Sequence, residues 1–220
     1  MQKTKDFKRE GVVIEPANKA EKSVILLHGL GADAGDLSEL ANHLQPDTAN
    51  TRFVFPNAPL MPVTINGGML MPAWFDILGF SEHSKQDKDG IIEAKMHVDR
   101  IISEQHEQGI PHENIFIGGF SQGGALALYA GLHTPQRLGG IIALSTYLPI
   151  ADSLSPLHQS LPIFLAHGTH DPVLPLAWAK IAKAQLEGYG CEVYWREYPF
   201  EHTINYDEVS DLKKWLALKG

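Results

Sequence analysis

Short apolar runs rich in β-branched residues alternate along this chain with longer amphipathic stretches. The apolar runs are expected to be strands, at residues 12–14, 24–27, 52–55, 115–118, 140–144, 162–166 and 192–198. The amphipathic stretches are expected to be helices, near residues 36–44, 91–108, 122–133, 176–187 and 206–218. Apolar strands separated by helices are typical of a mostly parallel sheet that helices cover on both faces. The pattern therefore predicts an α/β fold.

Length, charge and cysteine content restrict the kinds of protein that this chain can be. The 220 residues suit one well-buried domain, so we predict a single domain over 1–220. A net charge of −8 without a Lys/Arg cluster argues against a nucleic-acid surface. The single cysteine, Cys191, excludes an intramolecular disulfide and is compatible with a reducing compartment. With no signal-peptide pattern and no apolar run near the ~20 residues of a spanning helix, the sequence predicts a cytoplasmic protein without a membrane span.

The stretch 56–88 breaks the alternation of strands and helices. It holds several prolines, a Gly67-Gly68 pair and the apolar run 69–75. Long irregular loops inside domains are usually functional or disordered. This one is too rich in Met, Trp and Phe for disorder, so we expect it to form part of a binding surface.

The segment Gly119-Phe120-Ser121-Gln122-Gly123 places a serine between an expected strand and an expected helix. A G-x-S-x-G in this position is a nucleophile elbow, a strained turn that exposes the serine hydroxyl above the sheet. Glycines flank the serine because a side chain there would collide with the turn. The motif alone is weak evidence: residues 79–83 begin in the same way but lack the closing glycine and a buried strand. The context makes Ser121 the candidate nucleophile.

A serine nucleophile needs a general base, usually histidine, and a carboxylate that orients it. Chemistry gathers where parallel strands end, and His202 follows the last strand, which fits the Ser…Asp/Glu…His order of α/β-hydrolases. Asp171 follows the preceding strand and is the expected acid, with Asp152 as its main rival. His28 and His167 adjoin glycine turns, so we interpret them as structural residues that hydrogen-bond loop backbone.

The tetrahedral intermediate of such a reaction needs two backbone N–H groups as an oxyanion hole. One normally belongs to the residue after the nucleophile, here Gln122, and one to the loop after an early strand, here Leu30. Glycines at positions 29 and 31 let that loop curl inward. This chemistry needs no cofactor. Because His-x-Glu and paired-cysteine patterns are absent, we expect no metal either.

Six segments in order along the chain carry a family resemblance: 28–33 (HGLGAD), 71–76 (MPAWFD), 118–124 (GGFSQGG), 144–148 (LSTYL), 167–175 (HGTHDPVLP) and 198–202 (YPFEH). Together they resemble the acyl-protein thioesterase, or phospholipase/carboxylesterase, family of small α/β-hydrolases, in a bacterial-type member. The resemblance runs from about residue 11 to the end. One departure is Glu201, where many relatives carry glycine before the base histidine.

The resemblance implies a Ser121–His202–Asp171 triad, with oxyanion amides from Leu30 and Gln122. It also implies hydrolysis of carboxylic esters and acyl thioesters without a cofactor, and pairing into weak homodimers. The substrate would be a small-molecule or protein-linked acyl group.

We expect the acyl chain of the substrate to lie on Met69, Met71, Trp74 and Leu174; core packing is the alternative for the methionine-rich run. Flexible methionines suit a pocket that accepts varied chains. Two alternative functions stay open at this point. One is a hydrolase of lysophospholipids or small peptides, and the other is a scaffold that binds acylated ligands without turnover.

Overall fold

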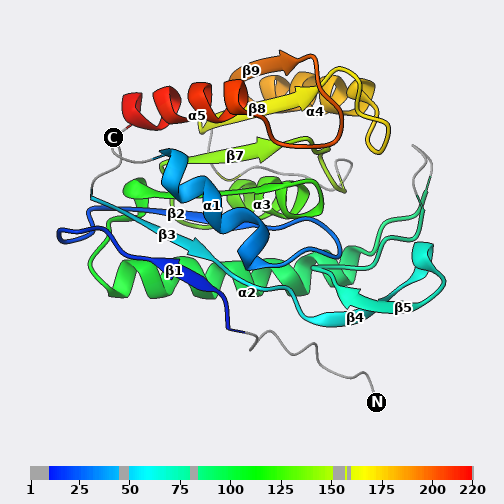
Figure 1. Cartoon of the computed structure of the whole chain (residues 1–220), viewed down its shortest axis with the longest axis horizontal. Helices are drawn as coiled ribbons and strands as arrows, with labels where there is room; N and C mark the ends of the chain where they lie inside the picture. Colours follow the sequence, from blue (N-terminus) through cyan, green and yellow to red (C-terminus); the bar gives the residue numbers. More distant parts are fainter. Residues whose placement is uncertain (1–9, 45–49, 80–83, 151–156, 158–159, 220) are drawn as a thin grey trace.

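The central sheet runs through the whole molecule (Figure 1). The computed structural model describes residues 10–44, 50–79, 84–150, 157 and 160–219, and in these ranges the sheet has seven strands in the order β1-β3-β2-β6-β7-β8-β9. Their bounds are β1 Val12–Ile14, β2 Lys22–Leu27, β3 Thr51–Phe55, β6 Ile115–Phe120, β7 Gly140–Leu144, β8 Pro162–Gly168 and β9 Glu192–Tyr198. β1 is antiparallel to β3, and the other neighbouring pairs are parallel.

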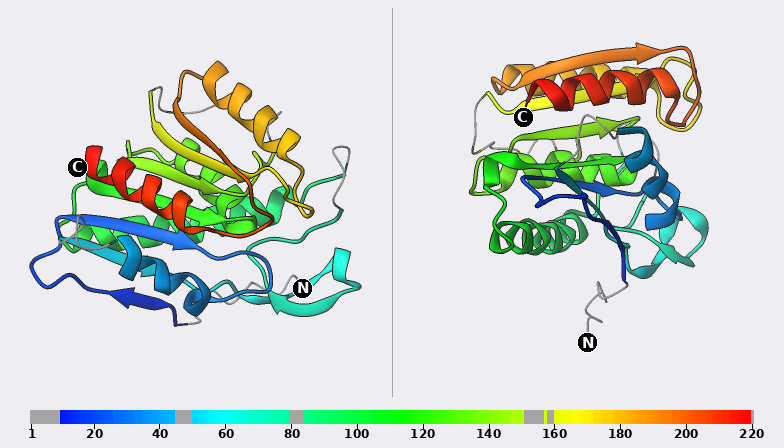
Figure 2. Two further views of the ribbon diagram at one scale, coloured as in Figure 1. Left: turned by 45° about the horizontal axis from the view of Figure 1, so that its top comes forward. Right: turned by 60° about the vertical axis from the view of Figure 1, so that its left-hand side comes forward.

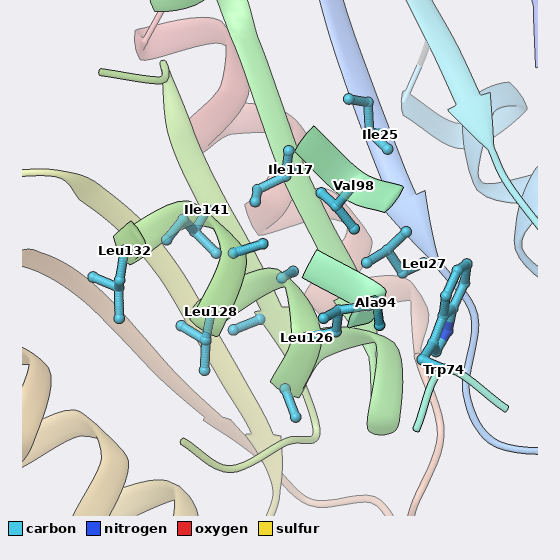
Figure 3. Packing of buried hydrophobic residues seen from close by; sticks show 14 of the residues in the cluster. Ile25, Leu27, Trp74, Ala94, Val98, Ile117, Leu126, Leu128, Leu132 and Ile141 are labelled. Carbon is cyan, nitrogen blue, oxygen red and sulfur yellow. The ribbon is translucent and has the colours of Figure 1, made fainter. Parts of the chain in front are cut away.

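Helices cover both faces of this sheet (Figures 1 and 2). One face carries α1 (Ala34–Leu44) and α5 (Tyr206–Leu218), and the other carries α2 (Lys88–Glu107), α3 (Gln122–His133) and α4 (Leu176–Gly188). Successive side chains of a strand point to opposite faces. In β7, Ile141 therefore joins the apolar cluster under α2, α3 and α4, part of which Figure 3 shows, while Ile142 joins the cluster under α1 and α5.

The structure confirms the predicted α/β fold, with each expected strand and helix close to its predicted range. Two helices begin earlier than expected, α1 at Ala34 and α2 at Lys88. The stretch 56–88 was expected to be irregular, but part of it forms regular structure. It contains an antiparallel hairpin of β4 (Leu60–Val63) and β5 (Met69–Pro72), joined through the short 3₁₀ helix Thr64–Asn66. Pro62 and Pro72 lie in its strands, and proline argues against a strand when only the sequence is available.

The parallel strands all end at one edge of the sheet, so the segments that follow them meet there. These segments include the loop after β2, the turn after β6, and the loops after β7, β8 and β9. The β4–β5 hairpin also reaches this edge, because the Gly31 N–H donates a 2.9 Å hydrogen bond to the Pro72 carbonyl. Within the described ranges, no helix combines the length and the hydropathy that a bilayer crossing needs.

Candidate active site

Ser121 lies in the tight turn between β6 and α3. Its φ of 54° lies in a backbone region that non-glycine residues rarely adopt. The turn leaves no room for side chains on the flanking glycines: a Cβ on Gly123 would come within 2.1 Å of the Leu27 carbonyl oxygen, and one on Gly119 within 2.4 Å of the Gly123 carbonyl carbon. The Ser121 N–H donates to the Leu144 carbonyl at 2.9 Å, which ties the turn to β7.

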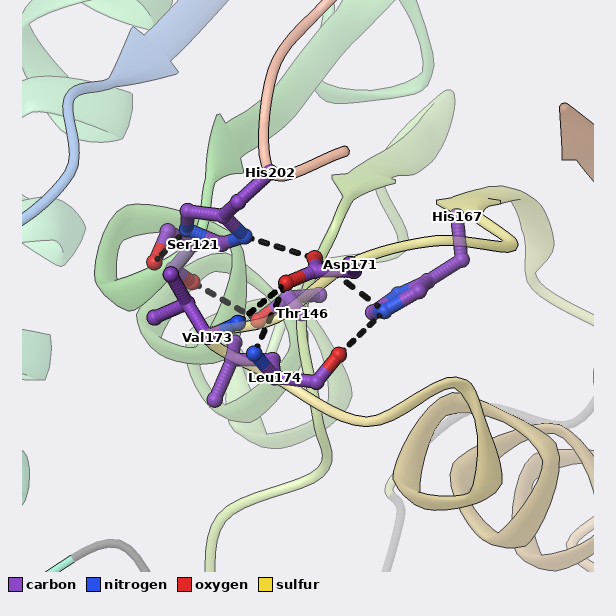
Figure 4. A network of polar contacts seen from close by, with 7 residues as sticks. All are labelled: Ser121, Thr146, His167, Asp171, Val173, Leu174 and His202. Atoms are coloured by element: carbon purple, nitrogen blue, oxygen red, sulfur yellow. Dashed lines mark hydrogen bonds and ion pairs between the residues drawn. The ribbon is translucent and has the colours of Figure 1, made fainter. Parts of the chain in front are cut away.

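His202 and Asp171 meet Ser121 in a chain of hydrogen bonds (Figure 4). The His202 Nε2 lies 3.0 Å from the Ser121 Oγ, and the His202 Nδ1 lies 2.6 Å from Asp171 Oδ2. A carboxylate accepts, so Nδ1 carries the imidazole proton and Nε2 can accept the proton of the serine hydroxyl. The rival acid of the sequence analysis, Asp152, lies outside the described residues.

The Asp171 carboxylate is buried, and hydrogen bonds to both of its oxygens fix its orientation. Its side chain has no exposed surface. Oδ1 accepts hydrogen bonds from the backbone N–H groups of Val173 and Leu174, each at 2.8 Å, and Oδ2 faces His202. A carboxylate held by two amides cannot rotate away from the imidazole, so the loop after β8 sets the direction of the His202 ring.

His167, at the end of β8, contacts the same carboxylate. It is fully buried, and its Nε2 lies 2.8 Å from the Leu174 carbonyl oxygen and 3.4 Å from Asp171 Oδ2. A carbonyl can only accept, so Nε2 carries a proton and donates it to Leu174, and the ring lies close to the carboxylate. Burial lowers the pKa of His167, which keeps its ring neutral near pH 7. The sequence analysis predicted a histidine that bonds loop backbone, and this is confirmed; its contact with Asp171 was missed.

Two further residues support the site without having been predicted. The Thr146 hydroxyl donates to the Ser121 carbonyl at 2.7 Å. The Phe120 ring packs against the His202 ring, with 4.7 Å between the centroids. The position of Thr146 just after β7, at the edge where the strands end, was the available signal. The contact of Phe120 with His202, 82 positions later in the chain, had no signal in the sequence that could have predicted it.

The two amides expected to bind an oxyanion both border the turn. In the described part of the chain, neither the Leu30 nor the Gln122 N–H donates to a protein acceptor. The Gln122 side chain points away from the serine, since its Oε1 accepts from the Trp74 N–H at 3.0 Å and its Nε2 donates to the Phe75 carbonyl at 2.7 Å. Segment 73–75 is thereby tied to the start of α3.

The four residues expected to contact an acyl chain lie in different environments. Met71 is half-buried beside the loop that carries Leu30, with its sulfur 4.0 Å from where a Cβ on Gly31 would lie. Met69 is 64% exposed on the hairpin. Trp74 and Leu174 are 0% and 2% exposed, so their side chains present almost no surface to a ligand. Trp74 instead donates from its indole N–H to the His28 carbonyl at 2.8 Å and packs in the core.

His28 also serves the loops around the site. Its Nδ1 lies 2.8 Å from the Gly29 carbonyl oxygen, and its Nε2 accepts from the Ala58 N–H at 3.0 Å. The predicted structural role of His28 is confirmed. Across the described residues, no group of three or more His, Cys, Asp or Glu side chains is placed to hold a metal ion.

A mostly parallel sheet with a serine, a histidine and a carboxylate in contact at its carboxyl edge defines the class of α/β-hydrolases. The family model described as phospholipase/carboxylesterase matches residues 8–219. Acyl-protein thioesterase 1 of Saccharomyces cerevisiae is 40% identical over 223 residues, which cover 94% of this chain and 96% of the relative. Acyl-protein thioesterase 1 of Yarrowia lipolytica is 38% identical over 212 residues, which cover 91% and 93%.

Solved structures of similar fold point to the same family. Arabidopsis thaliana SOBER1 has a TM-score of 0.85 and 31% identity, covering 91% of this chain and 99% of that one. Acyl-protein thioesterase 2 of Zea mays also has a TM-score of 0.85, with 27% identity and coverage of 96% and 99%. The chain belongs to the phospholipase/carboxylesterase family of α/β-hydrolases. It is a serine hydrolase of the esterase and thioesterase type.

Proposed function

We propose that this protein hydrolyses carboxylic esters and acyl thioesters in two steps, through an acyl-enzyme on Ser121. The observation that carries the proposal is the line of contacts from the Ser121 Oγ through His202 to Asp171, at 3.0 and 2.6 Å. In the first step His202 Nε2 takes the hydroxyl proton while Oγ attacks the carbonyl carbon. Asp171 holds the imidazole tautomer and stabilises the imidazolium that forms.

The same imidazolium then protonates the departing alcohol or thiol as the tetrahedral intermediate collapses. Water enters, gives its proton to His202 and attacks the acyl carbon. Collapse of this second intermediate releases the carboxylic acid and restores the Ser121 hydroxyl. The N–H groups of Leu30 and Gln122 stabilise the negative oxygen in both intermediates. Their support is their position at the turn and their freedom from other protein acceptors among the described residues.

The acyl chain, in this proposal, lies along the half-buried apolar residues between the Leu30 loop and the β4–β5 hairpin. Four such residues pack against the same apolar cluster: Leu30, Met61, Ile65 and Met71. Met71 is retained from the expected set, while Trp74 and Leu174 become supporting residues because they are buried. An apolar surface of this kind discriminates weakly, at ~1–3 kcal/mol per methylene. We therefore expect a broad preference for acyl length.

The test is kcat/KM for the wild type and Ser121→Ala on matched oxygen esters and thioesters, from acetyl to palmitoyl. Removing the nucleophile should lower kcat by about 10⁴- to 10⁶-fold, with an unchanged thermal unfolding midpoint as evidence that the variant is folded. A higher rate on thioesters would favour deacylation as the native reaction. Residual activity within tenfold of the wild type would refute the proposal, and a folded wild type inactive on every substrate would favour a ligand-binding scaffold.

A further inference from the structure

A cavity of about 530 Å³ lies on the side of His202 that faces α1. Its walls come from α1, from the segment that leads from His202 into α5, from the loop after β2, and from Phe120 just before Ser121. Phe120 and Gly29 are among them, and a Cβ added to Gly29 would lie 3.5 Å from the Ser121 Cβ. The candidate base His202 therefore lines the cavity, and the candidate nucleophile Ser121 lies next to two of its wall residues, Gly29 and Phe120.

This cavity and the hairpin surface lie over opposite faces of the sheet. Leu40, Phe120 and Ile204, in the cavity wall, pack against the apolar cluster under α1 and α5. Leu30 and Met71 pack against the other cluster, under α2, α3 and α4. Two separate surfaces thus flank Ser121, one for each half of a substrate.

Proton transfer assigns the two halves. With the oxyanion against the Leu30 and Gln122 amides, the acyl carbon carries two further groups, the acyl chain and the leaving group. The atom that departs must lie within hydrogen-bond reach of His202 Nε2, which protonates it. The cavity wall contains His202 and the residues that follow it, so the leaving group extends into the cavity. The acyl chain then points to the apolar surface at Met71.

The charges of the wall indicate what kind of leaving group fits. Asp36 and Glu39 lie one turn apart on α1, both exposed, and both line the cavity. Asp36 accepts a 2.8 Å hydrogen bond from the Asp33 N–H, and within the described ranges neither carboxylate forms an ion pair. Among the described residues that line the cavity there is no Lys or Arg; its basic side chains are His28, His43 and His202, of which His43 is nearest in sequence to the two acids.

We propose that this cavity holds the leaving-group half of the substrate and selects a basic peptide, with Lys or Arg beside the acylated residue. The inference rests on the proposed function and adds a substrate class to it. Opposite charges attract across the cavity mouth, while the apolar part of the wall contacts the peptide stem. A leaving group rich in Asp or Glu is disfavoured for the same reason.

The experiment uses three S-octanoyl peptides that are identical except that Arg, Gln or Glu flanks the acylated cysteine on both sides. We expect kcat/KM to fall in the order Arg, Gln, Glu. Asp36→Asn and Glu39→Gln should each reduce the Arg-over-Gln ratio by about two- to fivefold, the range for exposed ion pairs. Added salt should also reduce it, since it screens exposed charges. Glu104→Gln, an exposed acid on α2 outside the cavity, is the matched control for net charge and should leave the ratio unchanged.

A second variant tests which half of the substrate enters the cavity. Leu40→Trp narrows the cavity, so it should lower kcat/KM for the Gln peptide more than for S-methyl thiooctanoate, whose leaving group is small. Equal losses on both would put the acyl chain in the cavity and overturn the proposal. A wild type that hydrolyses all three peptides equally, in a Ser121-dependent way, would overturn it while leaving the proposed function intact. No Ser121-dependent hydrolysis of any peptide or thioester would refute both.

Discussion

At the scale of single residues, the site depends on groups held in costly states. Ser121 keeps a φ of 54°, a conformation that costs of order 1–3 kcal/mol for a non-glycine residue. Hydrogen bonds from its N–H to Leu144 and from Thr146 to its carbonyl hold it there. The buried His167 and the two backbone amides on Asp171 act in the same way on the acid. Part of the stability of the fold is therefore offset by the strain that keeps Ser121, His202 and Asp171 in their orientations.

Glu208 is a second buried group in an unfavourable state, in the first turn of α5 just after the His202 loop. It has no exposed surface, and within the described residues neither of its carboxyl oxygens has a hydrogen-bond partner. Burial raises the pKa of Glu208 from 4.5 to about 8. The folded protein therefore keeps this proton between about pH 4.5 and about pH 8, while the unfolded chain loses it.

This difference predicts how stability changes with pH. Across that window the Glu208 proton makes the free energy of unfolding fall with rising pH, by up to about 1.4 kcal/mol per pH unit. Glu208→Gln removes the contribution, so the variant should gain stability relative to the wild type as pH rises from 5 to 8. Urea unfolding at four pH values measures it, with Glu104→Gln as the exposed control. A Glu208→Gln difference that stays constant with pH would contradict the prediction.

At the scale of elements, the β4–β5 hairpin and segment 73–75 close the site on the side of α2 and α3. The hairpin reaches the Leu30 loop through the Gly31–Pro72 hydrogen bond, and Gln122 ties Trp74 and Phe75 to α3. In the proposed function the hairpin therefore supplies substrate surface, while the segment behind it is held rigidly by these hydrogen bonds. Two neighbouring apolar side chains, Met71 and Trp74, should thus differ in what they do.

The prediction compares Met71→Ala with Trp74→Ala. Met71→Ala should lower kcat/KM for an octanoyl ester about tenfold more than for the acetyl ester, because it shortens the apolar surface for the chain. Trp74→Ala should lower the free energy of unfolding by about 3–5 kcal/mol and reduce activity equally on both esters. Met96→Ala, at a 54% exposed position on α2, is the control. A length-dependent loss in Trp74→Ala would instead return Trp74 to the acyl site.

Much of this arrangement of elements could be predicted from the sequence because each catalytic candidate lies at or shortly after the end of a strand. Ser121 comes after β6, Asp171 after β8 and His202 after β9, and a parallel sheet brings such ends together. The β4–β5 hairpin could not be predicted, because each of its strands contains a proline, and proline argues against a strand. The burial of Trp74 could not be predicted either, since an apolar residue in a long loop is equally compatible with a ligand-binding surface and with the core.

At the scale of the whole molecule, the sheet divides the surroundings of Ser121 into two regions. The apolar region between Leu30 and Met71 lies over the face of α2, α3 and α4, and the cavity with Asp36 and Glu39 lies over the face of α1 and α5. In the two proposals above, the α/β architecture thus separates an apolar half of the substrate from a charged half, with the reacting bond at the carboxyl edge between them. The central claim is that Ser121 forms the covalent intermediate at this edge.

The most direct test of that claim is the intact-protein mass of the wild type and Ser121→Ala after incubation with a fluorophosphonate probe, followed by peptide mapping of the adduct. The account predicts one adduct per chain on Ser121, none on Ser121→Ala, and much slower labelling of His202→Ala, because the base that activates the hydroxyl is gone. A folded wild type that stays unlabelled, or a Ser121→Ala variant labelled as fast as the wild type, would contradict it.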